Sequence, residues 1–541
     1  MRFTGHVDRF AEEHLPPASQ LPDIVFDRAG LDYSDVLNAA EYFVDRHVHE
    51  RRGERRAIVV PHGIDWTYHD LQRAANRIAN VLADDFGVVS GDRVLLRAPN
   101  CAMLAACWLA VLKAGAIAVT TMPLYRSAEL RYMMDKAAVT LALCDAGLSE
   151  DLELALAGRD DVRVCFFNTE ATDGLDARMD AKSNAFANVE TAAEDIAIIA
   201  FTSGTTGTPK AAMHYHRDLI ATCDTYGKHV LQPKADDLFC GSPPLAFTFG
   251  LGGQLLFPLY VGAGTLLLEK APPEALLRAI DTFGVTTIFT APIAYRTMLG
   301  LMHAYDTSTL HTCVSAGETL PKAVFDAWHE QTGLKILDGI GSTEMLHIFI
   351  GSSKERARSG STGQAVYGYV AEIHDEDGAP LPPGEVGRLA VKGPTGCKYL
   401  DDERQVTYVQ HGWNYPGDAY RMDDEGYFYY VARMDDMIVS AGYNISGPEV
   451  EQALLTHEHV REVAVIAKPD PQHDTHIVKA YVVMVGVEHH TLQKIDELRE
   501  HVKRMIAPFK APREIEFVTE LPRTETGKVQ RYKLRQRASA E

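Results

Sequence analysis

Short apolar runs alternate with amphipathic stretches along the first half of the chain. From 67 to 82, apolar residues recur every three or four positions, and Thr67 stands three residues before Asp70, the spacing of a capping box. This pattern predicts a helix with one buried face. Apolar runs typical of strands lie at 93–97, 116–120, 139–144, 162–167, 196–201 and 285–289. Strands that alternate with helices in this way predict an α/β architecture with parallel strands.

The hydrophobic pattern also separates other kinds of segment. The most apolar stretch, 101–122, is interrupted by Lys113 and Gly115, which predicts a buried helix followed by a strand and argues against a membrane span. Residues 170–190 are polar and aperiodic, which predicts a surface loop. Later, Ser446-x-x-Glu449 predicts a helix start. Apolar runs at 463–467 and 479–485 then predict the strands of a compact α+β unit.

Length and charge indicate two unequal domains and exclude some partners. A chain of 541 residues is too long for one compact core, which predicts a large domain and at least one smaller domain. A formal charge of −21 argues against nucleic acid or an anionic membrane as the main partner. Residues 501–541 nevertheless hold ten Lys or Arg against five Asp or Glu. This end is either a solvated basic face or a patch for polyanionic ligands.

The cysteines and the N-terminal residues indicate the compartment. The eight cysteines are scattered singly, without a C-x-x-C pair, as in a protein with reduced thiols and no cysteine metal site. The first residues carry charges at Arg2, Asp8 and Arg9 and no apolar signal core. We therefore expect a cytoplasmic protein, with neither a membrane nor a nucleic acid as its partner.

The stretch TSGTTGTPK at 202–210 carries the strongest chemical signal. It follows the apolar run 196–201, so a strand leads into a loop of small and hydroxylated residues whose N–H and O–H groups can surround phosphate. Lys210 adds a mobile positive charge. The spacing differs from that of a Walker A loop, which requires G-x-x-x-x-G-K-[ST]. The alternative is a polar surface turn, because Gly, Ser, Thr and Pro are common in turns.

Further motifs follow in a fixed order. They are SAGE at 315–318, DGIGSTE at 338–344, YPGD at 415–418, ARMD at 432–435 and PRTETGK at 522–528. With 202–210, this order resembles the adenylate-forming superfamily, which includes acyl- and aryl-CoA ligases, firefly-luciferase-like enzymes and the adenylation domains of peptide synthetases. The wording at 290–296 and 345–347 is most similar to aryl-CoA ligases of the benzoate and 2-aminobenzoate type.

The resemblance implies a site for ATP and Mg²⁺. Its phosphate loop comprises Thr202, Ser203, Gly204, Thr205, Thr206 and Gly207. Its adenine and ribose contacts are Ala316, Gly317, Glu318, Asp338, Gly339, Ile340, Asp418 and Arg433, with Ile340 where relatives commonly carry Tyr. Thr343 contacts the α-phosphate, and Lys210 and Lys528 are catalytic. Glu344, also counted as catalytic, holds Mg²⁺, a role that suits a carboxylate because Mg²⁺ prefers hard oxygen ligands.

The resemblance also implies a pocket for the acid. Its lining comprises Phe247, Thr248, Phe249, Gly250, Gly341 and His347. Peptide synthetases place Asp where Thr248 stands, and a buried ammonium without a carboxylate partner is unfavourable, so an α-amino acid substrate is disfavoured. Phe249 and the glycines after it suggest a flat slot for an aromatic ring. The alternative for the aromatic residues and for His347 is an ordinary hydrophobic core.

The implied reaction uses two half-reactions and two domains. A domain at 1–434 binds ATP and a small aromatic carboxylate, either 2-aminobenzoate or benzoate, and forms an acyl-adenylate with release of pyrophosphate. A domain at 435–541 then turns about Asp435 and forms a channel at Gly442, so that the thiol of coenzyme A attacks the adenylate. Alternatives are a medium-chain fatty acyl-CoA ligase and an adenylating enzyme that loads a carrier protein. We expect a monomer or a homodimer.

Overall fold

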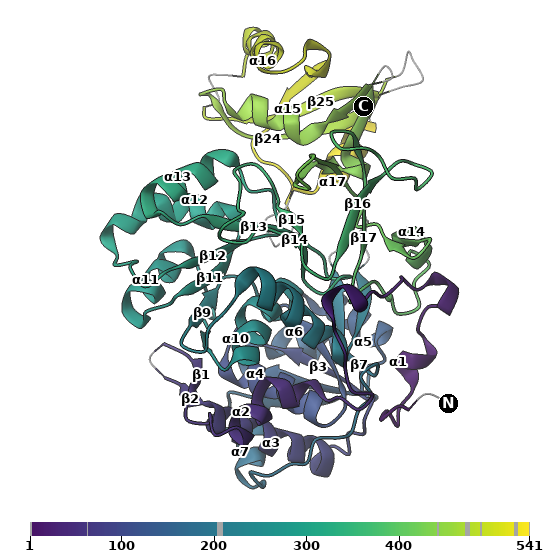
Figure 1. Cartoon of the computed structure of the whole chain (residues 1–541), viewed down its shortest axis with the longest axis vertical. Helices are drawn as coiled ribbons and strands as arrows, with labels where there is room; N and C mark the ends of the chain where they lie inside the picture. The colour runs from purple at the N-terminus through teal and green to yellow at the C-terminus, as the bar shows by residue number, and fades with distance from the viewer. Residues whose placement is uncertain are drawn as a thin grey trace.

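The computed structural model describes residues 3–61, 63–202, 209–440, 443–470, 476–486, 490–523 and 529–539. Figure 1 shows a large body built around β-sheets and a smaller group of C-terminal elements at one end. The body holds sheets of six, nine and six strands, and the C-terminal group holds sheets of two and three strands. The predicted α/β architecture, with a large N-terminal part and a small C-terminal part, is confirmed.

The first sheet contains most of the strands predicted from the apolar runs. In the order β6-β5-β3-β4-β7-β8, its neighbouring strands are parallel except for β7 and β8, which form an antiparallel hairpin. The strands are β3 (Arg93–Arg97), β4 (Ile117–Thr121), β5 (Leu141–Asp145), β6 (Arg163–Phe167), β7 (Ile196–Thr202) and β8 (Lys210–Tyr215). The hairpin makes Thr202 and Lys210 register partners at one edge of the sheet.

The second sheet has nine strands in the order β15-β14-β13-β12-β11-β9-β10-β1-β2. The strands are β1 (Arg56–Val59), β2 (Asp65–Thr67), β9 (Leu238–Gly241), β10 (Gly264–Leu266), β11 (Thr287–Thr290), β12 (Thr312–Ser315), β13 (Ile336–Gly341), β14 (Ile348–Gly351) and β15 (Gln364–Ala365). The six strands from β13 to β1 are parallel. Their carboxyl ends therefore gather at one edge, where open α/β sheets bind ligands.

Two predicted helices form from the local signals expected. α3 (Tyr68–Asn80) begins at a complete capping box, in which the Thr67 side chain accepts from the Asp70 N–H. α4 (Ala102–Lys113) is buried along nearly its whole length, and β4 follows it, as predicted for 101–122. Among the helices of the described ranges, none has the length and apolarity needed to cross a membrane.

The other α-helices of the body lie over and beside the sheets (Figure 1). They are α1 (Phe10–Glu13), α2 (Arg46–His49), α5 (Ser127–Lys136), α6 (Ser149–Leu156), α7 (Leu175–Asp180), α8 (His216–Thr222), α9 (Thr248–Leu251), α10 (Phe257–Val261), α11 (Pro273–Phe283), α12 (Pro292–Leu301), α13 (Lys322–Thr332) and α14 (Gln405–Tyr408). The prediction of a loop throughout 170–190 is wrong, because α7 lies within it. Leu175 and Met179, four residues apart, are buried and hold one face of this short helix against the core.

A third, antiparallel sheet precedes the C-terminal part, and the sequence pattern did not predict it. Its strands are β16 (Val370–His374), β17 (Val386–Lys392), β18 (Val409–Gln410), β19 (Trp413–Asn414), β20 (Asp418–Met422) and β21 (Phe428–Arg433). All of its pairings are antiparallel. The hairpin of β20 and β21 carries two of the predicted nucleotide contacts.

The C-terminal part is an α+β unit with its own apolar core, as predicted. Its elements are β22 (Met437–Ser440), β23 (Tyr443–Ser446), α15 (Gly447–Leu455), β24 (Val460–Pro469), β25 (His476–Met484), α16 (Leu492–Met505), β26 (Glu514–Phe517) and α17 (Arg531–Ser539). The Ser446 side chain accepts from the Glu449 N–H and caps α15, which confirms the predicted helix start.

The basic C-terminal end is largely paired with acids of the same unit. The pairs are Lys503–Glu500, Lys510–Glu449, Arg523–Glu462, Arg531–Glu451, Arg535–Asp436 and Arg537–Glu516. These pairs favour a salt-bridged face over an open patch for polyanions.

Candidate active site

The hairpin of β7 and β8 frames the predicted phosphate-binding stretch. Thr202 ends β7, Lys210 begins β8, and the two face each other across the hairpin. The Thr202 Oγ1 is buried without a hydrogen-bond partner among the described residues. Such an atom gains free energy when a ligand atom pairs with it. The predicted loop residues Ser203, Gly204, Thr205, Thr206 and Gly207 lie outside the described residues.

Lys210 joins Glu344 and Tyr399 in a compact cluster. The Lys210 Nζ donates to the Tyr399 hydroxyl at 2.6 Å and lies 3.2 Å from Glu344 Oε1. The Tyr399 hydroxyl donates to the same Oε1 at 2.5 Å. Burial raises the pKa of Glu344, but the charge of Lys210 and the Tyr399 hydroxyl outweigh burial and leave that pKa lowered. Glu344 is therefore an ionised carboxylate at neutral pH, although it is buried.

Sequence reasoning assigned Lys210 and Glu344 to one site, and the structure places their side chains 3.2 Å apart, but that reasoning did not include Tyr399. Tyr399 lies between β17 and α14, far from both partners in the sequence, and a bridge between Ala212 and Tyr399 lays its segment along β8. A single Tyr in the apolar run GCKYL carries no chemical pattern. Only the long-range pairing could have identified it.

A buried polar network lies behind the turn that carries Glu344. The His214 Nε2 donates to the Thr343 carbonyl at 2.7 Å. The His214 Nδ1 lies 3.8 Å from Asp218, and Asp218 forms an ion pair with Lys398 at 3.0 Å. Both side chains of this pair are almost completely buried. The network therefore supports Thr343, the predicted α-phosphate contact, through the His214 hydrogen bond to its carbonyl.

The predicted adenine contacts lie on neighbouring strands. Ser315, the last residue of β12, pairs in register with Asp338 of β13. The loop after β12 begins with buried Ala316, turns at Gly317 with a φ of +87°, and leaves Glu318 exposed. A positive φ of this size favours glycine. The structure thus brings this loop to the edge where Asp338 lies.

Asp338 has the character of a ligand contact. Its Oδ1 is buried without a hydrogen-bond partner among the described residues, and burial raises the pKa of its carboxyl group. A buried polar atom of this kind is costly unless a ligand pairs with it. Gly339 and Ile340 continue β13, and the half-buried Ile340 offers the aliphatic face expected at that position.

The hairpin of β20 and β21 brings Asp418 and Arg433 together. They are register partners, and Arg433 Nη1 donates to Asp418 Oδ2 at 3.2 Å and to the Pro416 carbonyl at 2.9 Å. The predicted hinge residue Asp435 lies in the turn Met434–Asp436 directly after β21, and its side chain is not described. Gly442 and Lys528 lie outside the described residues.

His347 lies among aromatic rings. Ring centroids of Phe257, Tyr226, Phe249 and Phe289 are 4.7, 5.2, 5.9 and 6.4 Å from its own. Neither buried ring nitrogen has a close hydrogen-bond partner among the described residues, and burial, opposed only in part by the Phe249 backbone, lowers the pKa of His347 to about 3. The imidazole is therefore neutral at pH 7 and has one free acceptor nitrogen.

The glycines after Phe249 make room for protein rings. A Cβ on Gly252 would lie 2.3 Å from His347 Cδ2, and one on Gly253 would lie 2.5 Å from Phe289. A Cβ on Gly250 would lie 2.0 Å from the Pro244 carbonyl oxygen. The glycines thus allow the rings of His347 and Phe289 to pack closely against the α9 segment. Any slot for an aromatic substrate would therefore be bounded by these two rings.

The other predicted acid contacts differ in their surroundings. Thr248 is buried at the start of α9, whereas half-buried Phe247 packs against a different part of the core from Phe249. A Cβ on Gly341 would lie 2.6 Å from the His347 carbonyl oxygen, so this glycine also permits a close backbone approach. The structure therefore groups Phe249, Gly341 and His347 and sets Phe247 on a separate face.

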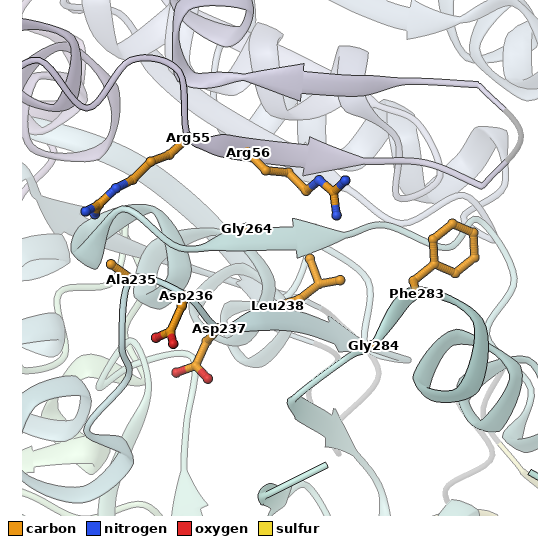
Figure 2. A pocket seen from close by; sticks show the side chains of 9 residues that line it. All are labelled: Arg55, Arg56, Ala235, Asp236, Asp237, Leu238, Gly264, Phe283 and Gly284. Atoms are coloured by element: carbon orange, nitrogen blue, oxygen red, sulfur yellow. The ribbon is translucent and has the colours of Figure 1, made fainter. Parts of the chain in front are cut away.

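A hollow of about 580 Å³ lies at the amino ends of the parallel strands of the nine-stranded sheet, between the starts of β1, β9 and β10 (Figure 2). Figure 2 shows Arg55 and Arg56 extending to different sides, while the carboxylates of Asp236 and Asp237 point away from both. Its charged groups do not converge on one point. The convergent chemistry described above lies at the carboxyl ends of the strands instead.

The fold and these residues define a class that sequence comparison identifies independently. A profile of AMP-binding enzymes matches residues 44–398, and a profile of the AMP-binding enzyme C-terminal domain matches residues 449–528. The chain belongs to the AMP-binding, adenylate-forming enzyme family. Within that family it is an AMP-forming acyl-CoA ligase, an acid–thiol ligase that uses ATP, Mg²⁺ and coenzyme A.

Characterised relatives cover nearly the whole chain. A benzoate–CoA ligase of Thauera aromatica is 32% identical over 532 residues, which span 96% of this chain and 98% of the relative. The crystal structure of the anthranilate CoA ligase AuaEII in complex with anthranoyl-AMP superposes with a TM-score of 0.87 at 32% identity, over 95% of this chain and 99% of that one. A benzoate CoA ligase structure from Burkholderia xenovorans LB400 gives a TM-score of 0.82 at 31% identity, over 92% and 100%.

The residues around Glu344 fit the Mg²⁺ that such ligases use. An ionised carboxylate is a hard oxygen ligand, and the predicted phosphate loop ends beside it at Lys210. When bound with ATP, the metal ion supplies positive charge that offsets the charge of the phosphates. Glu344 is the residue that would hold it.

Proposed function

We propose that this ligase activates an aromatic carboxylate, either 2-aminobenzoate or benzoate, and that the side chains around His347 favour 2-aminobenzoate. The observation that carries the proposal is the buried, neutral imidazole of His347, which lies among aromatic rings and whose acceptor nitrogen has no donor among the described residues. The aryl specificity named for the relatives supports it.

The chemistry of the pocket supports an ortho-amino substituent. An aniline N–H is a donor, and the buried imidazole has a free acceptor nitrogen that gains from pairing. A benzoate ring fits the same aromatic surroundings but leaves that nitrogen unpaired. Discrimination by a contact of this kind is worth about 1–3 kcal/mol. Thr248 adds no carboxylate for an α-ammonium group, which disfavours α-amino acids.

In the first half-reaction, a carboxylate oxygen of the acid attacks the α-phosphorus of ATP, and the bond to pyrophosphate breaks. Two anions must approach each other, so the contribution of the protein is mainly positioning and positive charge. In this proposal Lys528 meets the carboxylate and the α-phosphate. Lys210 and the hydroxyls of 202–206 hold the departing pyrophosphate, and Thr343 contacts the α-phosphate.

The remaining residues hold the nucleoside and prepare the second half-reaction. Asp338, Gly339 and Ile340 with the loop 316–318 contact adenine, and Asp418 with Arg433 contacts ribose. The C-terminal domain, proposed to span 435–541, then turns about Asp435 and brings Gly442 to the site. The thiolate of coenzyme A attacks the acyl carbon, the bond to AMP breaks, and the thiol proton passes to solvent.

The deciding experiment is pyrophosphate release with ATP and Mg²⁺ across 2-aminobenzoate, benzoate, 2-hydroxybenzoate and octanoate, each with and without coenzyme A. The proposal predicts CoA-dependent turnover on the aryl acids, with kcat/KM highest for 2-aminobenzoate by about ten-fold over benzoate, from one hydrogen bond. Turnover on octanoate alone would contradict it and indicate a medium-chain fatty acyl-CoA ligase. Adenylation that coenzyme A cannot discharge would indicate a carrier protein as acceptor.

A further inference from the structure

Tyr399 is held rigidly at the centre of the cluster with Lys210 and Glu344. Its segment runs antiparallel to β8, with Met213 N–H donating to the Lys398 carbonyl at 2.7 Å and Leu400 N–H donating to the Ala211 carbonyl at 2.8 Å. Its own N–H donates to Gln405 Oε1 at 2.9 Å. The residue is completely buried. The strand that begins at Lys210 thus fixes the Tyr399 ring.

The three polar groups satisfy one another in a closed arrangement. The Tyr399 hydroxyl accepts from Lys210 at 2.6 Å and donates to Glu344 Oε1 at 2.5 Å, while Lys210 and Glu344 are 3.2 Å apart. The Lys210 Nζ also lies 4.8 Å from the centre of the Tyr399 ring. Lys210 is therefore paired with both Glu344 and Tyr399, and a phosphate that pairs fully with its ammonium group would compete with Glu344 for it.

The departure of Lys210 would leave Glu344 with one protein partner in the cluster. That partner is a phenol, which is neutral and donates one hydrogen bond, so it fixes the carboxylate without cancelling its charge. A second lysine at this place would neutralise the carboxylate and compete with a metal ion. Tyr399 thus keeps Glu344 in place and leaves its negative charge available.

We propose that Tyr399 is a positioning residue that keeps Glu344 in the orientation required by Mg·ATP while Lys210 moves from Glu344 to the phosphates. The inference rests on the proposed roles of Lys210 and Glu344. Nucleotide binding is then an exchange of partners, in which the Lys210–Glu344 pair opens and the Tyr399–Glu344 hydrogen bond remains.

The test compares Tyr399→Phe with Tyr408→Phe in the full chain. Tyr408 is a matched control, because its ring lies 5.7 Å from Lys210 Nζ but its hydroxyl bonds Ser342 Oγ at 3.0 Å and does not contact Glu344. Calorimetric titration without any acid measures binding of ATP with excess Mg²⁺, of ATP with EDTA, and of AMP. None of these readouts depends on turnover.

Tyr399→Phe should weaken binding of ATP with Mg²⁺ by about 10- to 100-fold, the range for one hydrogen bond to a charged group. AMP binding should change less than about two-fold, because AMP lacks the β- and γ-phosphates and does not require Glu344. Tyr408→Phe should leave all three ligands unchanged. With EDTA, the deficit of Tyr399→Phe should largely disappear.

Equal weakening of ATP and AMP in Tyr399→Phe would overturn the proposal, since it would indicate general damage to the site. Unchanged binding of Mg·ATP would overturn it as well. The proposed substrate can be refuted independently of the role of Tyr399. In that case the panel of acids would show no turnover on aryl acids, while the Mg·ATP titrations would still give the expected pattern.

Discussion

Gly252→Ala tests whether the position of His347 determines acid selection. Gly252 follows α9 as the first residue of the π-helical segment Gly252–Leu256 and has a helical conformation, with a φ of −61° and a ψ of −55°. A Cβ there would lie 2.3 Å from His347 Cδ2, 2.6 Å from its Nε2 and 3.2 Å from Phe257 Cε2. The imidazole must therefore move by about 1 Å to restore an ordinary van der Waals contact.

The effect on stability should be small because two terms oppose each other. Overpacking a core typically costs about 1–3 kcal/mol. Replacing a helical glycine by alanine recovers about 1 kcal/mol. The net loss in the free energy of unfolding should thus be about 0–2 kcal/mol, and the variant should fold.

The effect on the acid should be larger. Moving a hydrogen-bonding nitrogen by about 1 Å removes most of its contribution, so kcat/KM for 2-aminobenzoate should fall by about ten-fold or more. The value for benzoate should fall less, and the preference between the two acids should approach unity. The assay is pyrophosphate release with both acids, alongside urea unfolding.

Gly300→Ala provides the control. Gly300 lies in α12, where a Cβ would meet nothing within 4 Å. This variant should gain up to about 1 kcal/mol of stability and keep both kinetic values. If Gly252→Ala is folded and retains the preference for 2-aminobenzoate, the reasoning that assigns selection to His347 is refuted.

Three other perturbations test the fold and the site. Lys398→Met removes the nearest cation from buried Asp218, which keeps the Tyr215 N–H and the more distant His214 and Arg217, and should cost about 3–5 kcal/mol in urea unfolding. Adding Asp218→Asn should restore most of the loss, and a loss below about 1 kcal/mol would contradict the buried pair. Burial lowers the folded-state pKa of both His216 and His347 to about 3 from 6.5, so protons bind the unfolded state more tightly and stability is lost as pH falls below 6.5. Each histidine should lower the free energy of unfolding by about 2 kcal/mol between pH 7.5 and pH 5. Replacing either one by Gln should make the urea midpoint depend less on pH. Lys528→Ala should abolish adenylation and keep ATP binding, and unchanged pyrophosphate release would exclude the catalytic role.

The fold could be predicted where the signal is local. The capping box at Thr67 and the runs that became β3 and β7 are short-range patterns, and their elements formed within two residues of the expected bounds. α7 was missed because Leu175 and Met179 are only two apolar positions in a polar segment, and burial against distant residues stabilises it. In the third sheet, β18 and β19 have only two residues each, too few to carry an alternating pattern.

The candidate site divides in the same way. Motifs identified Lys210 and Glu344, and the structure brings them within 3.2 Å of each other. The sequence did not predict the contacts of Tyr399 or the ion pair of Asp218 and Lys398, because their partners lie far away in the sequence. Ordered motifs thus predict which residues meet the ligand, whereas the groups that support them emerge only from three-dimensional pairing.

The ion pairs of α17 have a consequence for building chimaeras. Arg535 contacts Asp436 at 2.6 Å and Arg531 contacts Glu451 at 2.7 Å, so the last helix is fastened to residues at the beginning of the C-terminal unit. A junction placed before Met434 would transfer both pairs intact into a hybrid enzyme. If the C-terminal unit were transferred to another enzyme with a junction after Met437, Asp436 would stay behind. Arg535 would then depend on a carboxylate at the corresponding position of the foreign body. Shifting the junction by a few residues therefore decides whether an exchanged C-terminal unit keeps both of the ion pairs that hold α17.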